Sequence, residues 1–304
     1  MNDYYAVANT SKQAHHSAMR RRVELQDRFL LLSIVLAEER GKHPSMSLKK
    51  LYHCLAPNFV GRDAFVDFGM ENGFEPLENA KKPKTSASSE RIVYPNLLRD
   101  LKIWDIDQVW TSDITYFKIK SAWHYISLIE DLYSRRIIGF NASKNMFALA
   151  NLETFTMALN TRNIAKFGNK LVHHSDRGSQ YHADIYVQAI LKAEIKISMG
   201  QSCFDNVYME SANRIVKKEY LIHRNINSLD DLTFHLKKDI NLYNAERPHG
   251  SLNKMTPIQF ERYISNIPIT KRTLMPVFTS KRKKHISLLP QDDPMQLKLN
   301  FPRF

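Results

Sequence analysis

The feature that most constrains the fold of this chain is the stretch Leu171-Val-His-His-Ser-Asp-Arg-Gly-Ser-Gln-Tyr181, an apolar run that passes directly into an acidic turn. Leu171 to His174 predict a short buried strand, Asp176 follows the end of that strand, and Gly178 allows the backbone to turn sharply. A carboxylate at a strand end is a common metal ligand in α/β proteins, and it is also a favoured helix cap. Taken alone, Asp176 fits the helix cap better than the metal ligand.

Asp113 changes that balance because it lies in the middle of a predicted strand. The stretch 109–117 is rich in β-branched and aromatic residues, which is typical of a strand. Asp113 carries the only charge on its face of this strand, where alternate side chains point the same way. The other residues on that face are Val109, Thr111, Thr115 and Phe117. A carboxylate in such a place is costly unless it is paired or bound to a metal ion.

A third acidic residue, Glu210, lies in the second turn of a predicted capped helix that begins at Asp205. Polar residues at helical spacing from Glu210 form one stripe on the same face. They are Asn206, Asn213, Arg214 and Lys217. Two aspartates and a glutamate together make a cluster of hard oxygen ligands, which suits Mg²⁺ with its preference for a few carboxylates and substrate phosphates. Two such ions can drive an in-line displacement at phosphorus.

Five sequence blocks, in order, carry a resemblance to a known family. They are Val109-Trp-Thr-Ser-Asp-Ile-Thr-Tyr116, Asp131-Leu-Tyr-Ser-Arg-Arg-Ile-Ile-Gly139, His174-Ser-Asp-Arg-Gly-Ser-Gln-Tyr181, Asp205-Asn-Val-Tyr-Met-Glu-Ser211 and Tyr243-Asn-Ala-Glu-Arg-Pro-His-Gly-Ser-Leu252. The segment from about Gln108 to Phe260 resembles the catalytic core of insertion-element transposases of the retroviral-integrase (DDE) superfamily. The match is to the subgroup whose catalytic part is encoded by the second of two overlapping reading frames.

This resemblance implies an α/β, ribonuclease-H-like catalytic core and a DNA transposase that cleaves element ends and transfers 3′ hydroxyl ends to target DNA. It implies that Asp113, Asp176 and Glu210 are the catalytic residues and the ligands of two Mg²⁺ ions, with Mn²⁺ as a substitute. It also implies DNA as partner, a homo-oligomer, and a helix-turn-helix and coiled-coil partner or fusion from the upstream frame. The setting would be the bacterial cytoplasm, in association with the nucleoid.

One departure from the family pattern lies between Asp176 and Glu210, where the chain is slightly shorter than in relatives. The missing residues fall in the loop 198–204, which would lie beside the active site. A shortened loop there would change DNA contacts or mark a decayed copy of the element. Two alternative functions therefore stay open: a metal-dependent nuclease on the same fold without strand transfer, and a DNA-binding protein that no longer cuts.

Composition favours a nucleic-acid partner. The formal net charge is +13 and the isoelectric point is about 9.6, which points to a polyanionic partner. We expect no membrane association, because no apolar run approaches the length that spans a bilayer. Two separated cysteines, Cys54 and Cys203, fit a reducing compartment. They also argue against an amino-terminal zinc domain built from two cysteines and two histidines.

Hydrophobic periodicity predicts three helices before the core, within residues 1–74. The first spans 23–40 with Leu25, Phe29, Leu32 and Leu36 inward, and the residues from Ser11 could start a separate short helix. The second begins after Ser47, and the third spans 61–72 and ends at Gly73. Three short helices suit a helix-turn-helix-like DNA-binding region, with a plain helical bundle as the alternative.

Four regions are expected along the chain: the helical region 1–74, a basic linker 75–104, the catalytic core 105–264 and a basic tail 265–304. The linker should dock onto the core near residues 94–98. Within the core, strands are predicted at 109–118, 123–131, 136–142, 170–174 and 194–199, and helices at 147–164, 182–192, 206–221, 229–243 and about 255–260. The last helix should have Thr256 as its cap and Pro257 at its first position. The first three strands, joined by short links, should form an antiparallel meander. The tail is expected to be a nucleic-acid arm, or a docking strand formed by 295–301.

Basic residues near the predicted acids and on the third helix are candidates for DNA contacts. They are Arg62, Arg177, Arg214, Lys217, Lys218 and Arg247. A solvated basic helix face is the alternative for the cluster after Glu210, and a simple ion pair within the helix could join Glu210 to Arg214. Arg247 has a purely structural role as its alternative.

Overall fold

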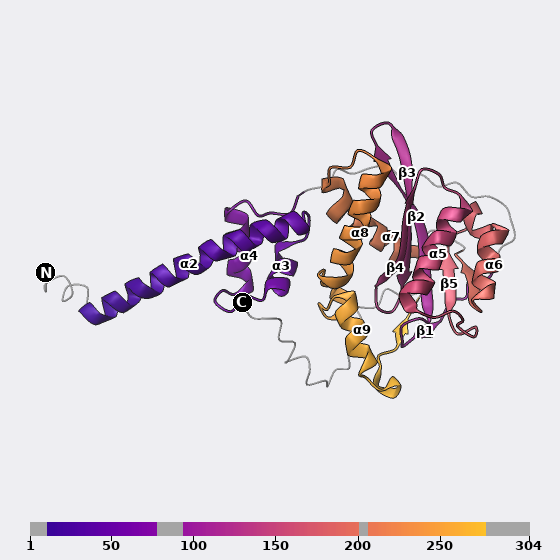
Figure 1. Cartoon of the computed structure of the whole chain (residues 1–304). Coiled ribbons are helices and arrows are strands. Elements are labelled where there is room, and N and C mark those ends of the chain that lie inside the picture. Colours follow the sequence, from indigo (N-terminus) through magenta and orange to yellow (C-terminus); the bar gives the residue numbers. More distant parts are fainter. Residues whose placement is uncertain (1–10, 78–93, 201–205, 278–304) are drawn as a thin grey trace.

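The computed structural model describes residues 11–77, 94–200 and 206–277. A helical region precedes an α/β core in the chain (Figure 1). The helical region holds α2 (Lys12–Lys42), α3 (Leu48–Leu55) and α4 (Arg62–Glu71). None of the helices within the described ranges is both long and apolar enough to cross a membrane.

Helix α2 is a single helix of 31 residues, so the expected break between a short helix and a helix starting at 23 is wrong. Its N-cap Ser11 accepts a hydrogen bond from the Ala14 amide at 3.1 Å, which favours a helix start there. Its N-terminal half extends away from the other elements (Figure 1). Leu25, expected to be buried, is therefore 43% exposed, whereas Leu36 is buried.

The second half of α2 forms a small core with the two shorter helices, as the periodicity predicted. Buried residues of this core are Leu32, Leu36, Met46, Leu48, Leu51 and Phe65. Gly73 follows α4 with φ +75°, a left-handed conformation that glycine adopts without strain, so the predicted helix end is confirmed.

The core is built on a mixed five-stranded sheet. Its strands are β2 (Val109–Ile119), β3 (Ala122–Asp131), β4 (Ile137–Ser143), β5 (Val172–Ser175) and β6 (Lys196–Met199), in the spatial order β4-β3-β2-β5-β6. The first three form the predicted antiparallel meander, and β5 and β6 run parallel to β2. This order, with helices between the parallel strands, is the ribonuclease-H-like topology.

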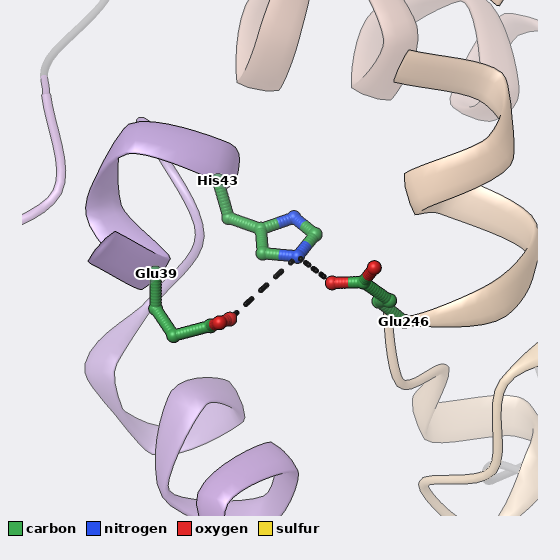
Figure 2. Close-up of side chains that lie close together, drawn as sticks. All are labelled: Glu39, His43 and Glu246. Atoms are coloured by element: carbon green, nitrogen blue, oxygen red, sulfur yellow. Dashed lines mark hydrogen bonds and ion pairs between the residues drawn. The ribbon is translucent and has the colours of Figure 1, made fainter. Parts of the chain in front are cut away.

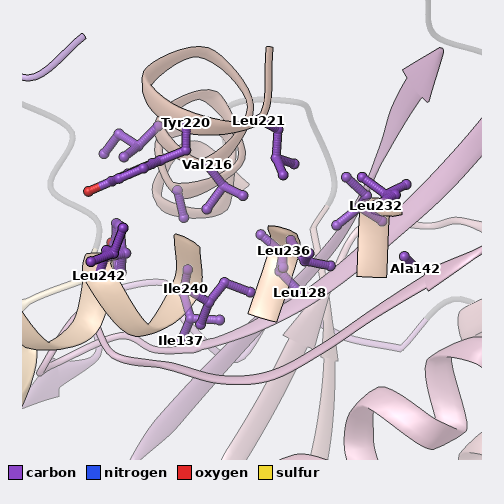
Figure 3. Close-up of a cluster of buried hydrophobic side chains, with 14 of the residues drawn as sticks. Leu128, Ile137, Ala142, Val216, Tyr220, Leu221, Leu232, Leu236, Ile240 and Leu242 are labelled. Carbon is purple, nitrogen blue, oxygen red and sulfur yellow. The ribbon is translucent and has the colours of Figure 1, made fainter. Parts of the chain in front are cut away.

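Helices cover both faces of the sheet. Helices α5 (Ala148–Arg162) and α6 (Asp184–Lys192) pack on one face through residues such as Phe155 and Ile190. Helices α7 (Val207–Ile215) and α8 (Leu229–Ala245) pack on the other face, where Leu128, Ile137, Leu236 and Ile240 meet (Figure 3). Instead of the single predicted helix 206–221, α7 continues into a π-helical turn, η3 (Val216–Tyr220), and a 3₁₀ turn, η4 (Leu221–His223).

The packed core extends beyond the predicted boundaries at both ends. Strand β1 (Lys102–Ile103) pairs with β7 (Met275–Pro276), and both Leu98 and Val277 are buried. Residues predicted as the end of the linker and the start of the tail therefore belong to the core. Helix α9 (Pro257–Ser265) begins with the predicted Thr256 cap, and the 3₁₀ turns η1 (Ser179–His182), η5 (Gly250–Leu252) and η6 (Ile269–Lys271) complete the elements. The expected linker at 78–93 and tail at 278–304 lie outside the described residues.

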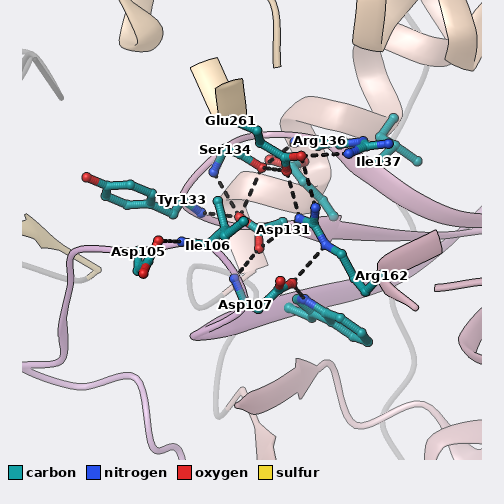
Figure 4. A network of polar contacts seen from close by, with 12 residues as sticks. Asp105, Ile106, Asp107, Asp131, Tyr133, Ser134, Arg136, Ile137, Arg162 and Glu261 are labelled. Atoms are coloured by element: carbon teal, nitrogen blue, oxygen red, sulfur yellow. Dashed lines mark hydrogen bonds and ion pairs between the residues drawn. The ribbon is translucent and has the colours of Figure 1, made fainter. Parts of the chain in front are cut away.

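A buried ionic network ties the β3–β4 turn to the helices (Figure 4). Arg162, at the end of α5, contacts Asp107 at 2.8 Å, Asp131 at 3.2 Å and Glu261 at 2.7 Å. Asp131 is fully buried and accepts hydrogen bonds from the Tyr133 and Ser134 amides. Burial and the charge of Asp131 raise the pKa of Asp107 to about 6, against the attraction of Arg162. Arg162 thus contacts three carboxylates, one of which, Glu261, also pairs with Arg136 at 2.6 Å.

We predict that Arg162→Met lowers the free energy of unfolding by about 3–5 kcal/mol, because buried carboxylates lose their compensating charge. The matched control is Lys166→Met. Lys166 pairs with Glu194 at 2.7 Å but is 66% exposed, so its loss should leave the free energy of unfolding almost unchanged. Urea unfolding of both variants measures the difference, and equal losses would contradict a structural role for the network.

Candidate active site

Parallel pairing of β2 with β5 brings two of the three predicted acids to one place. The register joins Val109 to Val172 and Thr111 to His174. The same register, continued past the end of β5, sets Asp113 level with Asp176. The negative charge of Asp176 accordingly acts on the Asp113 carboxyl group. The two aspartates, far apart in sequence, are neighbours because the strands that carry them are neighbours.

The turn after β5 holds Asp176 in place. Its Oδ1 accepts a hydrogen bond from the Gly178 amide at 2.9 Å. A Cβ at Gly178 would lie 2.2 Å from the Gln180 side chain and 3.0 Å from Asp176 Oδ1, so this turn accommodates no larger residue without a shift. Desolvation raises the pKa of Asp176, and the Gly178 hydrogen bond opposes that rise. Asp176 does not cap a helix: Gly178 is the N-cap of η1 and Ala183 that of α6.

Helix α7 runs along β2 and brings Glu210 to the same region. Asn213 donates a hydrogen bond from Nδ2 to Asp113 Oδ2 at 2.7 Å, and Lys217 Nζ contacts Thr115 Oγ1 at 3.0 Å. Glu210 is exposed one turn earlier on the same face. An open cavity of about 280 Å³ is lined by residues of β2, α7 and η3. Its lining residues are Asp113, Thr115, Glu210, Asn213, Arg214, Lys217 and Lys218.

The Asp113 carboxyl group is buried near two other acidic residues, and this environment shifts its pKa. Burial, together with the negative charges of Asp176 and Glu210, raises its pKa to about 7, against the opposing effect of hydrogen bonds from the Ile114 amide and Asn213. The carboxylate oxygens of the three acids do not all come within 4.8 Å of one another. A cation placed among these like charges would reduce their mutual repulsion. The donor set of three carboxylates fits a hard divalent ion.

Three of the predicted DNA-contact residues, Arg214, Lys217 and Lys218, line the cavity beside the acids. Arg177 lies on the turn after Asp176 and donates from Nε to the Gly200 carbonyl at 3.0 Å. Arg62 is exposed on α4, in the helical region, where it pairs with Asp63. The cavity is also lined by Thr115 and Asn213. The sequence placed Thr115 only on the same strand face as Asp113. The spacing of Asn213 from Glu210 indicated that these two residues share a helix face.

Arg247 is a correction to the predicted DNA contacts. Its side chain is 4% exposed and forms two short contacts with Glu219, at 2.8 and 2.9 Å. Glu219 lies on η3, and its carboxylate accepts hydrogen bonds from the buried guanidinium. Arg247 therefore has the structural role that was its alternative.

Comparisons with known proteins show the family of this chain. One integrase core domain family model matches residues 106–202 and a second integrase core domain model matches residues 191–257. The insertion element IS600 uncharacterized 31 kDa protein of Shigella sonnei is 31% identical over 245 residues, which cover 78% of this chain and 89% of that protein. The transposase for insertion sequence element IS904 of Lactococcus lactis is 29% identical over 175 residues, covering 56% and 68%.

Among solved structures, the HTLV-2 integrase catalytic core domain in complex with magnesium aligns with a TM-score of 0.41 and 17% identity, covering 55% of this chain and 99% of that one. The two family models fall on the segment that holds the sheet, the three acids and α7. The sequence relatives extend over more of the chain. This chain belongs to the insertion-element transposases, enzymes of the DDE type with an integrase core domain.

Proposed function

We propose that Asp113, Asp176 and Glu210 are the catalytic acids with which this DNA transposase cleaves element ends and joins their 3′ hydroxyl groups to target DNA. The observation that carries the proposal is the open, basic-rimmed cavity lined by Asp113 of β2 and Glu210 of α7, with the charge of Asp176, from the turn after β5, acting on Asp113. The raised pKa of Asp113 supports it, since strongly perturbed acids in a cleft are candidates for functional groups.

The same three carboxylates would hold two Mg²⁺ ions, with Mn²⁺ as a substitute, because hard oxygen ligands suit these ions. When bound, such ions activate an attacking oxygen and stabilise a leaving oxygen at phosphorus. Asp113 must give up its proton to act as a ligand. The amide of Asn213 orients the carboxyl group by donating a hydrogen bond to Oδ2.

The basic residues around the cavity would receive the DNA backbone. Arg214 and Lys218 are exposed on the helix that carries Glu210. Their charges would hold phosphates next to the acids, and backbone contacts of this kind fix position without reading sequence. Arg177 is a further candidate from the turn after Asp176. We propose that the helical region, with Arg62 on α4, also binds DNA.

A homo-oligomer is part of this proposal, because two element ends must be brought together before they are joined to one target. The partner or fusion from the upstream frame stays a prediction. This prediction can be examined by adding the upstream-frame protein to the DNA cleavage, joining and binding assays described below.

We predict that Glu210→Gln abolishes Mg²⁺- or Mn²⁺-dependent cleavage and joining on DNA that carries the element ends. The change removes the charge and keeps the shape, so the metal ligand is lost while α7 stays intact. Gel analysis of cleaved and joined products measures both steps. The control is Glu153→Gln on α5, whose carboxylate contacts Asn141 on the other face of the sheet and should leave activity unchanged.

The products also separate the alternative functions. Joined products that vanish in the Glu210 variant support the proposal. Cleavage without joining points to a nuclease, and metal-independent DNA binding alone points to an inactive binder. Cleavage that persists unchanged in Glu210→Gln removes this residue from the catalytic set.

We predict that Asp113→Asn makes the metal-free protein more stable at pH 8, by as much as about 4 kcal/mol. Because the pKa of Asp113 is about 7 when folded, the native state binds more protons than the unfolded state between pH 4 and 7. The free energy of unfolding of the wild type therefore falls as the pH rises from 4 to 7, whereas the asparagine variant has no titrating group at this position. The advantage of the variant should grow from pH 4 to 7 and then level.

Urea unfolding with a chelator at several pH values measures this advantage. Asp67→Asn, a charge removal at an exposed position on α4, is the control. A constant difference between wild type and Asp113→Asn across pH would contradict the electrostatic account.

We predict that Lys218→Ala weakens DNA binding for all sequences and lowers the slope of log affinity against log salt by about 1, because one phosphate contact is lost. Lys192→Ala on α6 serves as the control, since Lys192 is exposed on the face away from the acids. Binding titrations between low and moderate salt give both slopes, and identical slopes would remove Lys218 from the DNA path.

A further inference from the structure

A second group of possible metal ligands lies where the helical region meets the core (Figure 2). Glu39 and His43 come from the end of α2, and Glu246 follows α8. One carboxylate oxygen from each glutamate and one ring nitrogen of the histidine all lie within 4.8 Å of one another. Within the described residues, no other trio of histidine, cysteine, aspartate or glutamate meets this spacing.

The contacts within this group are poor as hydrogen bonds. His43 Nε2 lies 3.4 Å from Glu246 Oε2 and 4.0 Å from Glu39 Oε2. Charge-assisted hydrogen bonds are typically about 2.7–2.9 Å long, and one ring nitrogen carries a single hydrogen for two carboxylates. The distances fit a shared ion better. Ligands about 2.0–2.2 Å from a tetrahedral zinc ion are separated by about 3.4 Å.

Two of the three ligands, His43 and Glu39, are oriented towards the centre of the group by a second contact. The Tyr220 hydroxyl lies 3.1 Å from His43 Nδ1, which directs Nε2 at the carboxylates. Lys42 Nζ holds Glu39 Oε1 at 2.8 Å, which leaves Oε2 facing the ring. His43 is 1% exposed, so its ring cannot swing out to solvent. Outer contacts that fix the ligands in this way are characteristic of protein metal sites.

The surrounding interface is rigid enough to keep the three residues together. Arg224 donates to the Gly41 and Lys42 carbonyls at 2.9 and 2.8 Å, which satisfies the C-terminal end of α2. Buried Asp239 in turn binds Arg224 at 2.6 Å. The end of α2 is thus fastened to the core beside the candidate ligands.

We propose that Glu39, His43 and Glu246 bind a Zn²⁺ ion that joins the helical region to the catalytic core. One imidazole and two carboxylates make a donor set that zinc accepts and that leaves a position for water. Lys42 pairs with Glu39 from the outer side, and an ion between the two carboxylates would reduce their remaining mutual repulsion. The site is separate from the acids Asp113, Asp176 and Glu210 and does not depend on their role.

The test uses the full-length chain carrying Asp113→Asn and Glu210→Gln, so that the proposed catalytic acids contribute little metal binding. Zn²⁺ affinity is measured by calorimetry and by competition with a chelator, with Mg²⁺ in a parallel arm. Glu246→Gln should weaken Zn²⁺ binding by more than the about 10–100-fold that loss of an outer contact costs. Because Glu246 is 46% exposed, this variant should fold. Glu38→Gln is the control, since Glu38 is exposed on the same turn of α2 and pairs with Lys42.

A second readout keeps the proposal testable in a less stable variant. Zn²⁺ should raise the melting temperature of the parent chain and leave that of His43→Gln unchanged, because an ion that binds the native state stabilises it by mass action. Visible absorption of bound Co²⁺ should likewise disappear in His43→Gln. Equal Zn²⁺ affinity in the parent, Glu246→Gln and His43→Gln would overturn the proposal, as would absence of Zn²⁺ binding to the parent.

Discussion

The parallel pairing of β2 with β5 is the constraint on which the candidate active site depends. The pairing sets the register that places Asp113 level with Asp176, and the helices on both faces of the sheet keep the two strands together. Helix α7 can then contribute Glu210 because Asn213 and Lys217 fasten it to β2. A shift of β5 by one residue would turn its side chains to the opposite face and separate the acids.

Several motif residues that characterise this family turn out to support the scaffold. The block from Asp131 to Gly139 forms a turn whose first carboxylate is buried under Arg162. Gly139 lies under α5, where a Cβ would approach the Thr154 carbonyl oxygen to 2.3 Å, so no side chain fits between helix and strand. Arg247 fills a similar supporting role against Glu219. These residues hold the helices in position around the sheet. In this way they support the active site indirectly.

The helical region is tied to the same scaffold by polar contacts between distant parts of the chain. Arg224 binds the end of α2, and Tyr220 reaches His43 from the π-helical turn that continues α7. The helix that carries Glu210 is thus in physical contact with the region expected to bind DNA. A π-helical turn of this kind is unusual and is frequent at functional sites. Here it points Glu219 and Tyr220 at two different partners, Arg247 and His43.

The sequence by itself determined most of the elements and the candidate acids, because strand and helix periodicity are local and a lone charge on an otherwise uncharged strand face is visible without a fold. The antiparallel meander, the three amino-terminal helices and the Thr256 cap followed from those local patterns. Only the tertiary structure decided how Asp113 meets Asp176, since strand register depends on packing at both faces of the sheet. It also decided that Arg247 is buried, that Leu25 is exposed on an extended helix, and that residues up to Val277 join the core. The grouping of Glu39 and His43 with Glu246 belongs to this second class, because no local pattern links residues that meet only when the helical region docks on the core.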